Sequence, residues 1–166
     1  MPEGYTEFDT PIGRCGIAWG ARGIVRLHLP GSPPKRKHEG TALPPDVRAA
    51  IDGIVGVLSG ESDDLSWIKL DMDTVPDLHR RVYEVARTIP PGSTLSYGAI
   101  ATRLGDPALA REVGQALGRN PFAIVVPCHR VVGSDGKLGG FSAAGGTRTK
   151  LRLLAIEGAA TQPMFS

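Results

Sequence analysis

The sequence predicts an α/β protein, with a small N-terminal lobe of sheet plus helix followed by a mostly helical C-terminal lobe. Strand-like runs bounded by Gly and Pro fill the first third of the 166 residues, and apolar residues at helical spacing dominate from residue 78 onward. Residues 1–79 carry 8 Lys/Arg and 12 Asp/Glu, whereas residues 80–166 carry 11 and 5. We therefore expect two domains, residues 1–75 and 76–166, of which the second is basic.

The N-terminal domain is expected to contain strands and one helix. Turn residues separate four runs with strand character, at residues 5–10, 15–19, 23–29 and 67–72. A helix is predicted over residues 45–58, where apolar residues recur at helical spacing (Val47, Ile51, Ile54, Val55 and Leu58). The basic, Pro/Gly-rich residues 31–40 are predicted to form a mobile loop.

The C-terminal domain is expected to be helical, with helices over residues 78–89, 96–104, 107–119 and 147–156. Ser96 is a suitable cap for the second helix, while Asp106 caps and Pro107 begins the third. The third helix should end before Asn120-Pro121, because the residue before proline disfavours helical backbone. So few residues join the two central helices that they suggest a helix-turn-helix, although most such pairs bind nothing.

Four consecutive residues, Pro127-Cys128-His129-Arg130, hold most of the chemical information. Apolar runs flank them, so a thiol, an imidazole and a guanidinium are expected together in a largely buried stretch. Cysteine is nucleophilic as the thiolate, and a neighbouring base is how proteins supply the thiolate. The alternative is an inert core cysteine, which is the usual fate of a buried thiol.

Composition limits the class of protein. No apolar stretch approaches membrane-spanning length and the first residues form no basic or apolar leader, so we expect a soluble cytoplasmic protein without a membrane partner. Cys15 and Cys128 are the only cysteines; free thiols are expected, and a disulfide between them stays open. Neither has metal-ligand spacing to other residues, so no metal or cofactor is expected. The basic second half suits a phosphate-backbone partner or a solvated surface equally well.

Several motifs together resemble one known family. The segments that carry the resemblance are Pro127-Cys128-His129-Arg130-Val131, Asn120-Pro121, Ser96-Tyr97-Gly98 and Ile89-Pro90-Pro91-Gly92. They are similar to the O6-alkylguanine-DNA alkyltransferases, also called methylated-DNA–protein-cysteine methyltransferases. The resemblance covers residues 75–158 well and the N-terminal lobe loosely.

The resemblance implies a winged helix-turn-helix in the C-terminal domain and direct repair of double-stranded DNA carrying O6-alkylguanine. The alkyl group, mainly methyl, would pass to Cys128 after minor-groove binding and nucleotide flipping. The product is a thioether with no good leaving group, so the protein would act once. O4-methylthymine as a second substrate stays open, and so does cooperative assembly of the expected monomer on DNA.

The resemblance also implies five catalytic roles. Cys128 would accept the alkyl group, and His129 would remove the thiol proton through a water, steered by Glu157. Tyr97 would donate a proton to the guanine ring as charge moves onto the leaving base. Asn120 would tie the recognition helix to the active-site loop, a role compatible with an ordinary turn before proline.

A second set of residues would contact DNA. Arg111 would fill the gap that an extruded nucleotide leaves, while Ala110 and Gly114 keep the helix thin for the minor groove. Ser96, beside Tyr97, belongs to this set. Arg130 would either bridge the lobes or contact phosphate. An ordinary surface arginine is the alternative for Arg111.

The base pocket would be formed by the loop and by residues after it. The backbone carbonyls of Cys128 and Val131 would accept from the guanine amino group. Phe141 would pack on the alkyl group or base, and Ser142 would meet O6. The segment 141–157 is about two residues longer than usual, which leaves the role of Ser142 and the substrate range open.

Other departures from the family pattern lie in the helix before the motif. Leu78-His79 and Tyr83 stand where the family usually has Phe-Gln and Trp, and these are mostly packing changes. Two other classes of function stay open. The first is a lesion-binding relative that flips the base without transfer, although such relatives typically lack the cysteine. The second is a winged-helix regulator or a cysteine hydrolase, and nothing in the sequence specifies the oxyanion hole that a hydrolase needs.

Overall fold

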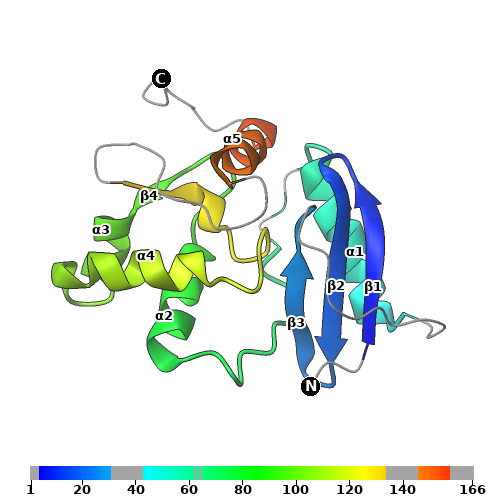
Figure 1. Ribbon diagram of the computed structural model, residues 1–166, viewed down its shortest axis with the longest axis horizontal. Coiled ribbons are helices and arrows are strands. Elements are labelled where there is room, and N and C mark those ends of the chain that lie inside the picture. Colours follow the sequence, from blue (N-terminus) through cyan, green and yellow to red (C-terminus); the bar gives the residue numbers. More distant parts are fainter. Residues whose placement is uncertain (1–3, 31–42, 62, 64, 134–145, 158–166) are drawn as a thin grey trace.

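The computed structural model describes residues 4–30, 43–61, 63, 65–133 and 146–157. It shows a mixed α/β protein, with an antiparallel sheet and one helix on one side and a group of helices on the other (Figure 1). The predicted fold class is confirmed. The loop expected at residues 31–40 and the expected pocket residues Phe141 and Ser142 lie outside the described residues.

The N-terminal sheet consists of three antiparallel strands in the order β1-β2-β3, with β1 at Gly4–Thr10, β2 at Gly13–Gly20 and β3 at Gly23–His28. The tight turns between them depend on Gly13 and Gly23, whose φ angles of +123° and +137° suit glycine. A Cβ atom on Gly23 would also lie 2.6 Å from the Lys69 carbonyl oxygen. The three strands predicted for this region are confirmed.

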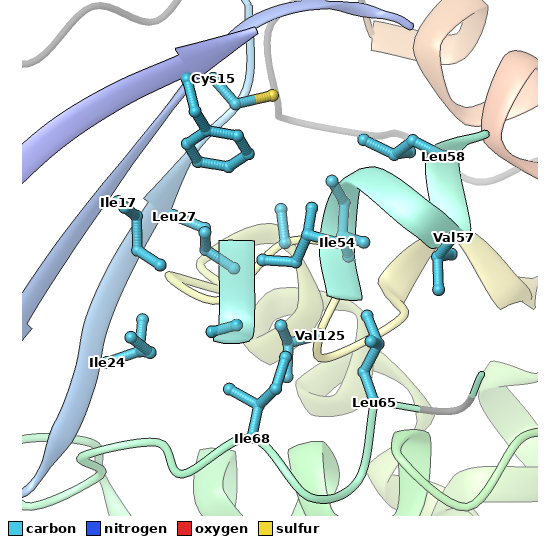
Figure 2. Close-up of a cluster of buried hydrophobic side chains, with 14 of the residues drawn as sticks. Cys15, Ile17, Ile24, Leu27, Ile54, Val57, Leu58, Leu65, Ile68 and Val125 are labelled. Carbon is cyan, nitrogen blue, oxygen red and sulfur yellow. The ribbon is translucent and has the colours of Figure 1, made fainter. Parts of the chain in front are cut away.

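Helix α1 (Pro45–Leu58) covers one face of the sheet. Pro45 in the first turn has no amide hydrogen to leave unsatisfied, and Asp46 complements the positive end of the helix dipole. Side chains from the sheet and from α1 interdigitate to form the first core (Figure 2). Val125 of the C-terminal half also enters this core, together with Ala123, Ile124 and Leu153.

The strand predicted at residues 67–72 is wrong. Only Leu70 bridges to Ile24 at the edge of β3, through hydrogen bonds from Ile24 N to Lys69 O (2.9 Å) and from Asp71 N to Ile24 O (2.8 Å). The Arg87 guanidinium donates to the carbonyls of three residues just upstream, Leu65, Ser66 and Ile68. Those carbonyls are thereby held in a compact loop and do not form a ladder.

The C-terminal domain consists of short helices and one pair of very short strands. In chain order these are α2 (Asp77–Ala86), β4 (Leu95–Ser96), α3 (Tyr97–Arg103), a 3₁₀ turn (Pro107–Leu109), α4 (Ala110–Gly118), a 3₁₀ turn (Cys128–Arg130), β5 (Val131–Val132) and α5 (Gly146–Ile156). The helices predicted from residues 96 and 147 are confirmed, and the one predicted from 107 begins as the 3₁₀ turn. The first ends at Ala86 rather than at residue 89. The parallel β4–β5 pair was not predicted.

The predicted helix caps explain the sharp turn between α3 and α4. Ser96 Oγ accepts from Ala99 N at 2.9 Å, and Asp106 Oδ1 accepts from Ala108 N at 2.9 Å. The second core lies beneath these helices and contains Tyr83, whose hydroxyl donates to the Ala116 carbonyl at 2.6 Å. This bond fixes α2 against α4. In the described part of the chain, no helix has the length and apolar character needed to cross a membrane.

Candidate functional site

The loop between α4 and the Cys128–Arg130 turn is held by one side chain. Asn120 donates from Nδ2 to the Val126 carbonyl (2.9 Å) and accepts at Oδ1 from Phe122 N (2.8 Å). Ile124 adopts a φ angle of +77°, which is unusual for a β-branched residue and strains the loop. Asn120 therefore joins the end of α4 to the segment that leads into Cys128.

Cys128 is buried, with 7% of its surface exposed. Burial raises the pKa of its thiol, while a hydrogen bond from Asn120, the positive charge of Lys150 and the nearby backbone amides act to lower it. The thiol is free, as is that of Cys15. The site thus opposes ionisation through desolvation and favours it through specific polar groups.

His129 lies beside a carboxylate from α5. Its Nε2 is 2.9 Å from Glu157 Oε2, although the two residues are 28 positions apart in the sequence. Burial lowers the pKa of the imidazole, so it is neutral at pH 7. The geometry places the proton on Nε2, donated to the carboxylate, and leaves Nδ1 as an acceptor that is buried without a partner among the described residues. A neutral imidazole in this tautomer is a competent base.

Glu157 is ionised although its side chain is only 4% exposed. Burial would raise its pKa, but hydrogen bonds from His129 and Arg130 and the positive charge of Arg130 outweigh burial and hold the pKa at about 2. Arg130 donates from Nε to both carboxylate oxygens, at 2.9 and 3.0 Å, and from Nη2 to Oε2. This is a strong, fork-like ion pair.

Arg130 itself is 3% exposed, and its remaining donor, Nη1, reaches the Ile89 carbonyl at 2.7 Å. Every one of these partners belongs to the C-terminal half of the chain. Neither the lobe-bridging role nor the phosphate contact expected for Arg130 is supported by this geometry. Its guanidinium is used inside the domain, where it neutralises Glu157.

Tyr97 begins α3 and is half-buried near the thiol. Burial raises the pKa of its hydroxyl, and Cys128 raises it further, so the phenol stays protonated and can act as an acid. The hydroxyl oxygen of Ser96 caps α3 by accepting a hydrogen bond. The structure therefore brings Tyr97 to the thiol and gives Ser96 a local structural role.

Three residues expected to contact DNA lie in the first half of α4, where Ala110 packs partly against the second core. Arg111 is exposed, and Ala110 and Gly114 are half-exposed one turn apart. A Cβ atom on Gly114 would meet nothing within 4 Å, so packing inside the described chain does not require glycine there. A smooth outer face is what a surface approached by another molecule would need.

One residue of the site was missed in the sequence analysis. Lys150, on α5, is only 1% exposed, and its Nζ donates to the Val131 carbonyl at 2.6 Å. Glu157 directly follows α5, about two helical turns after Lys150, so helical spacing predicts the two side chains on one side of this segment. That spacing was the available signal, but lysine is almost never fully buried, so the residue did not stand out.

Among the described residues, no group of three or more His, Cys, Asp or Glu side chains is placed to hold a metal ion. The groups around Cys128 are of the kinds that a cysteine nucleophile needs. A buried thiol, a neutral imidazole oriented by a carboxylate, and a protonated phenol lie at the same end of the second core. Such a set can accept an electrophilic carbon and protonate the group that leaves.

The sequence also matches proteins that are already known. The family model described as "6-O-methylguanine DNA methyltransferase, DNA binding domain" matches residues 77–159. A methylated-DNA–protein-cysteine methyltransferase of Mycobacterium leprae is 44% identical over 153 residues, which cover 91% of this chain and 90% of the relative. The chain belongs to the methylated-DNA–protein-cysteine methyltransferase family. This family is the one that the motifs around Cys128 predicted.

Two further relatives bear on the type of activity. The crystal structure of Mycobacterium tuberculosis OGT in complex with DNA aligns with a TM-score of 0.73 at 36% identity, covering 92% of each chain. A DNA base-flipping protein of Thermus thermophilus is 38% identical over 150 residues, covering 90% of this chain and 97% of the relative. The proteins similar to this chain thus include a methyltransferase, an OGT that is bound to DNA in its crystal structure, and a DNA base-flipping protein.

Proposed function

We propose that this protein repairs double-stranded DNA by moving the methyl group of O6-methylguanine onto Cys128, once per molecule. The observation that carries the proposal is the position of Cys128 next to His129, a neutral base oriented by Glu157. Family membership supports the reaction class, and the DNA complex of a relative supports the partner.

The chemistry follows from these groups. The thiol proton moves, through a water, to the free Nδ1 of His129, which leaves a thiolate. A sulfur lone pair forms the S–C bond to the methyl carbon as the C–O6 bond breaks, and the bonding pair stays on the base. Tyr97 donates its phenolic proton to the base that leaves. The thioether that remains offers water no leaving group, so the protein is not regenerated.

Base recognition would use two carbonyls of the same turn. The Cys128 carbonyl already accepts from Val131 N, and the Val131 carbonyl accepts from Lys150. Each oxygen has a second lone pair, so each can still accept from the guanine amino group. The exposed Arg111 and the open surface over Gly114 support α4 as the element that enters the groove while the nucleotide is rotated out.

The decisive experiment incubates the protein with a duplex that carries labelled O6-methylguanine and measures the intact mass. We expect one methyl group on Cys128 and one equivalent of lesion consumed per protein. Tight lesion binding without an adduct would instead support a non-catalytic lesion-binding protein, the alternative that the Thermus relative favours. Multiple turnovers would indicate a hydrolase and contradict the proposal.

The role of Arg111 has a separate test. Arg111→Ala should slow transfer from duplex DNA by about tenfold or more, because nucleotide extrusion loses its replacement in the stack. Transfer from free O6-benzylguanine, which needs no extrusion, should change little. Arg80→Ala, which removes an exposed arginine from α2, is the matched control. Equal losses on both substrates would remove the extrusion role.

A further inference from the structure

Lys150 is a buried cation that the reaction described above does not use. Its Nζ is fixed by the 2.6 Å hydrogen bond to the Val131 carbonyl, and only 1% of the residue is exposed. Val131 directly follows the short turn that contains Cys128. The ammonium group is therefore anchored to the end of the turn that presents the nucleophile, close enough for its charge to act on the thiol.

The charges around this lysine are unequal before the reaction. Glu157 is matched by Arg130 through a fork-like pair, and His129 is neutral. Among the described residues, Lys150 forms no ion pair with a carboxylate, and the two tyrosines that interact with the thiol, Tyr83 and Tyr97, stay protonated. A buried ammonium without a counter-ion is costly, and ionisation of Cys128 would supply the missing anion.

We propose that Lys150 is a positioning residue for the transfer reaction, whose ammonium group, anchored on the Val131 carbonyl, is the charge partner of the Cys128 thiolate. This inference rests on the proposed function in that the thiolate is the nucleophile. It adds to His129 a second contribution: the imidazole removes the proton, and the lysine stabilises the anion that results. The imidazolium that forms carries one positive charge, and the lysine supplies a second charge that is present before the proton moves.

The titration behaviour of the two groups supports this pairing. Burial lowers the pKa of Lys150 to about 8, and Cys128 acts to raise it again. The lysine is therefore still mostly protonated at pH 7. Conversely, the positive charge of Lys150 is among the factors that lower the pKa of the Cys128 thiol. Each group favours the charged form of the other, as expected for a coupled pair.

The first test needs no DNA. Iodoacetamide alkylates a thiolate with loss of iodide, so its rate from about pH 6 to about pH 10 reports the ionisation of Cys128. Lys150→Met removes the charge at similar volume, and Lys150→Arg retains it. In Lys150→Met the apparent pKa of the thiol should rise by about one unit or more, which lowers the rate at pH 7 about tenfold. Lys150→Arg should stay within about threefold of the wild type.

The shape of the pH profile separates charge from mere packing. If Lys150 acts through charge, the wild type and Lys150→Met should react at similar rates where both thiols are fully ionised. If the lysine only supports the fold, the Lys150→Met rate should be scaled by one factor at every pH. A Lys150→Met profile with the wild-type pKa would overturn the proposal.

A second measurement avoids substitution of the lysine. The Lys150 Nζ can be titrated by ¹⁵N NMR in the wild type and in Cys128→Ser, which cannot form a thiolate. We expect a lower pKa of Lys150 in Cys128→Ser, because the anion that favours the ammonium form is lost. Identical titration curves would refute the pairing even if Lys150→Met failed to fold. Methyl transfer from DNA is a separate readout, so the proposed function can stand if this inference fails.

Discussion

The molecule contains two buried thiols, and their surroundings differ. Cys15 lies on β2 in the first core, 3% exposed, with the Thr10 hydroxyl at 3.8 Å and the Gly13 carbonyl at 3.9 Å from its sulfur. Cys128 borders the second core and is met by Asn120, Lys150 and backbone amides. Burial raises the pKa of both thiols. Burial therefore does not distinguish a reactive cysteine from an inert one, whereas the local polar groups do.

The cores around the two thiols show the same contrast. The first core is formed by apolar side chains of the sheet, α1 and the loop before Cys128. In the described part of the chain, the residues that are both buried and ionisable besides cysteine and tyrosine belong to the Cys128–Arg130 turn or bond to the residue after it (His129, Arg130 and Lys150). Buried charges rarely improve stability over apolar residues of similar volume, so their concentration at one place is better explained by chemistry.

The largest expected effect comes from exchanging the nucleophile. Cys128→Ser should abolish methyl transfer, because a serine hydroxyl is far less acidic than a thiol, while lesion binding survives. Cys15→Ala should retain transfer within about twofold, since it removes a group with no link to the site. Transfer can be measured by intact mass and binding by fluorescence anisotropy. Loss of lesion binding in Cys128→Ser would mean that the thiol supports folding instead.

The two thiols should also differ in the unmodified protein. At pH 7.5, iodoacetamide should modify Cys128 about 100-fold faster than Cys15, because no positive charge helps Cys15 to ionise. Peptide mapping of a time course gives both rates in one sample, and urea serves as the control that should make the rates similar. Equal rates in the folded protein would show that the two environments do not change the reactivity of the thiols.

Glu157 connects the charged cluster to stability. Its pKa of about 2 lies below the ordinary value of 4.5, so its ionised form stabilises the fold above about pH 5, and this contribution is lost as the pH falls toward 2. Glu157→Gln leaves the Arg130 charge unpaired and should cost about 3 kcal/mol at pH 7. Urea unfolding at pH 7 and at pH 3 should show a smaller difference for Glu157→Gln than for the wild type.

The matched control is Asp77→Asn, which breaks the exposed Asp77–Arg80 pair and should change stability by less than about 0.5 kcal/mol. A Glu157→Gln protein with wild-type stability and the wild-type acid response would show that the cluster is not coupled to folding. In that case the contrast between the two cores would concern reactivity alone.

The smallest effect is expected at Tyr83, inside the second core. Tyr83→Phe removes the hydrogen bond to the Ala116 carbonyl and should lower the free energy of unfolding by about 1 kcal/mol. The rate of methyl transfer to Cys128 should stay unchanged. A large loss of transfer with little loss of stability would place the α2–α4 contact within the reactive machinery.

Local signals in the sequence predicted much of this fold. The strands of the N-terminal sheet, helix α1 and the caps at Ser96 and Asp106 follow from turn residues and short-range periodicity. The strand predicted at residues 67–72 is reduced to the single bridge of Leu70 to Ile24, and within this segment the Ile68 carbonyl is bonded to Arg87. The β4–β5 pair has two residues in each strand, which is too short for a pattern.

The functional site was harder than the fold to predict from short segments of the sequence. Cys128 and His129 stood out as a motif, but Glu157 could be paired with them only through the family resemblance. Lys150 was not singled out, and the contact of Arg130 with Glu157 was not predicted, for one physical reason. Basic side chains are ordinarily solvated, and only the three-dimensional arrangement shows that Arg130 lies against Glu157 and Lys150 against a carbonyl.

The loop between α4 and the Cys128–Arg130 turn contacts the N-terminal sheet as well as the C-terminal helices. Leu27 of β3 donates to the Pro121 carbonyl at 2.8 Å, and Ile124 and Val125 fill the first core. These contacts with the sheet thus help to fix the position of Cys128 in the protein. In a screen of natural variants, substitutions along β3 could lower repair capacity although they lie remote from any reacting atom. A fragment of residues 76–166 alone would lack these contacts and would need other interactions to hold the loop in place.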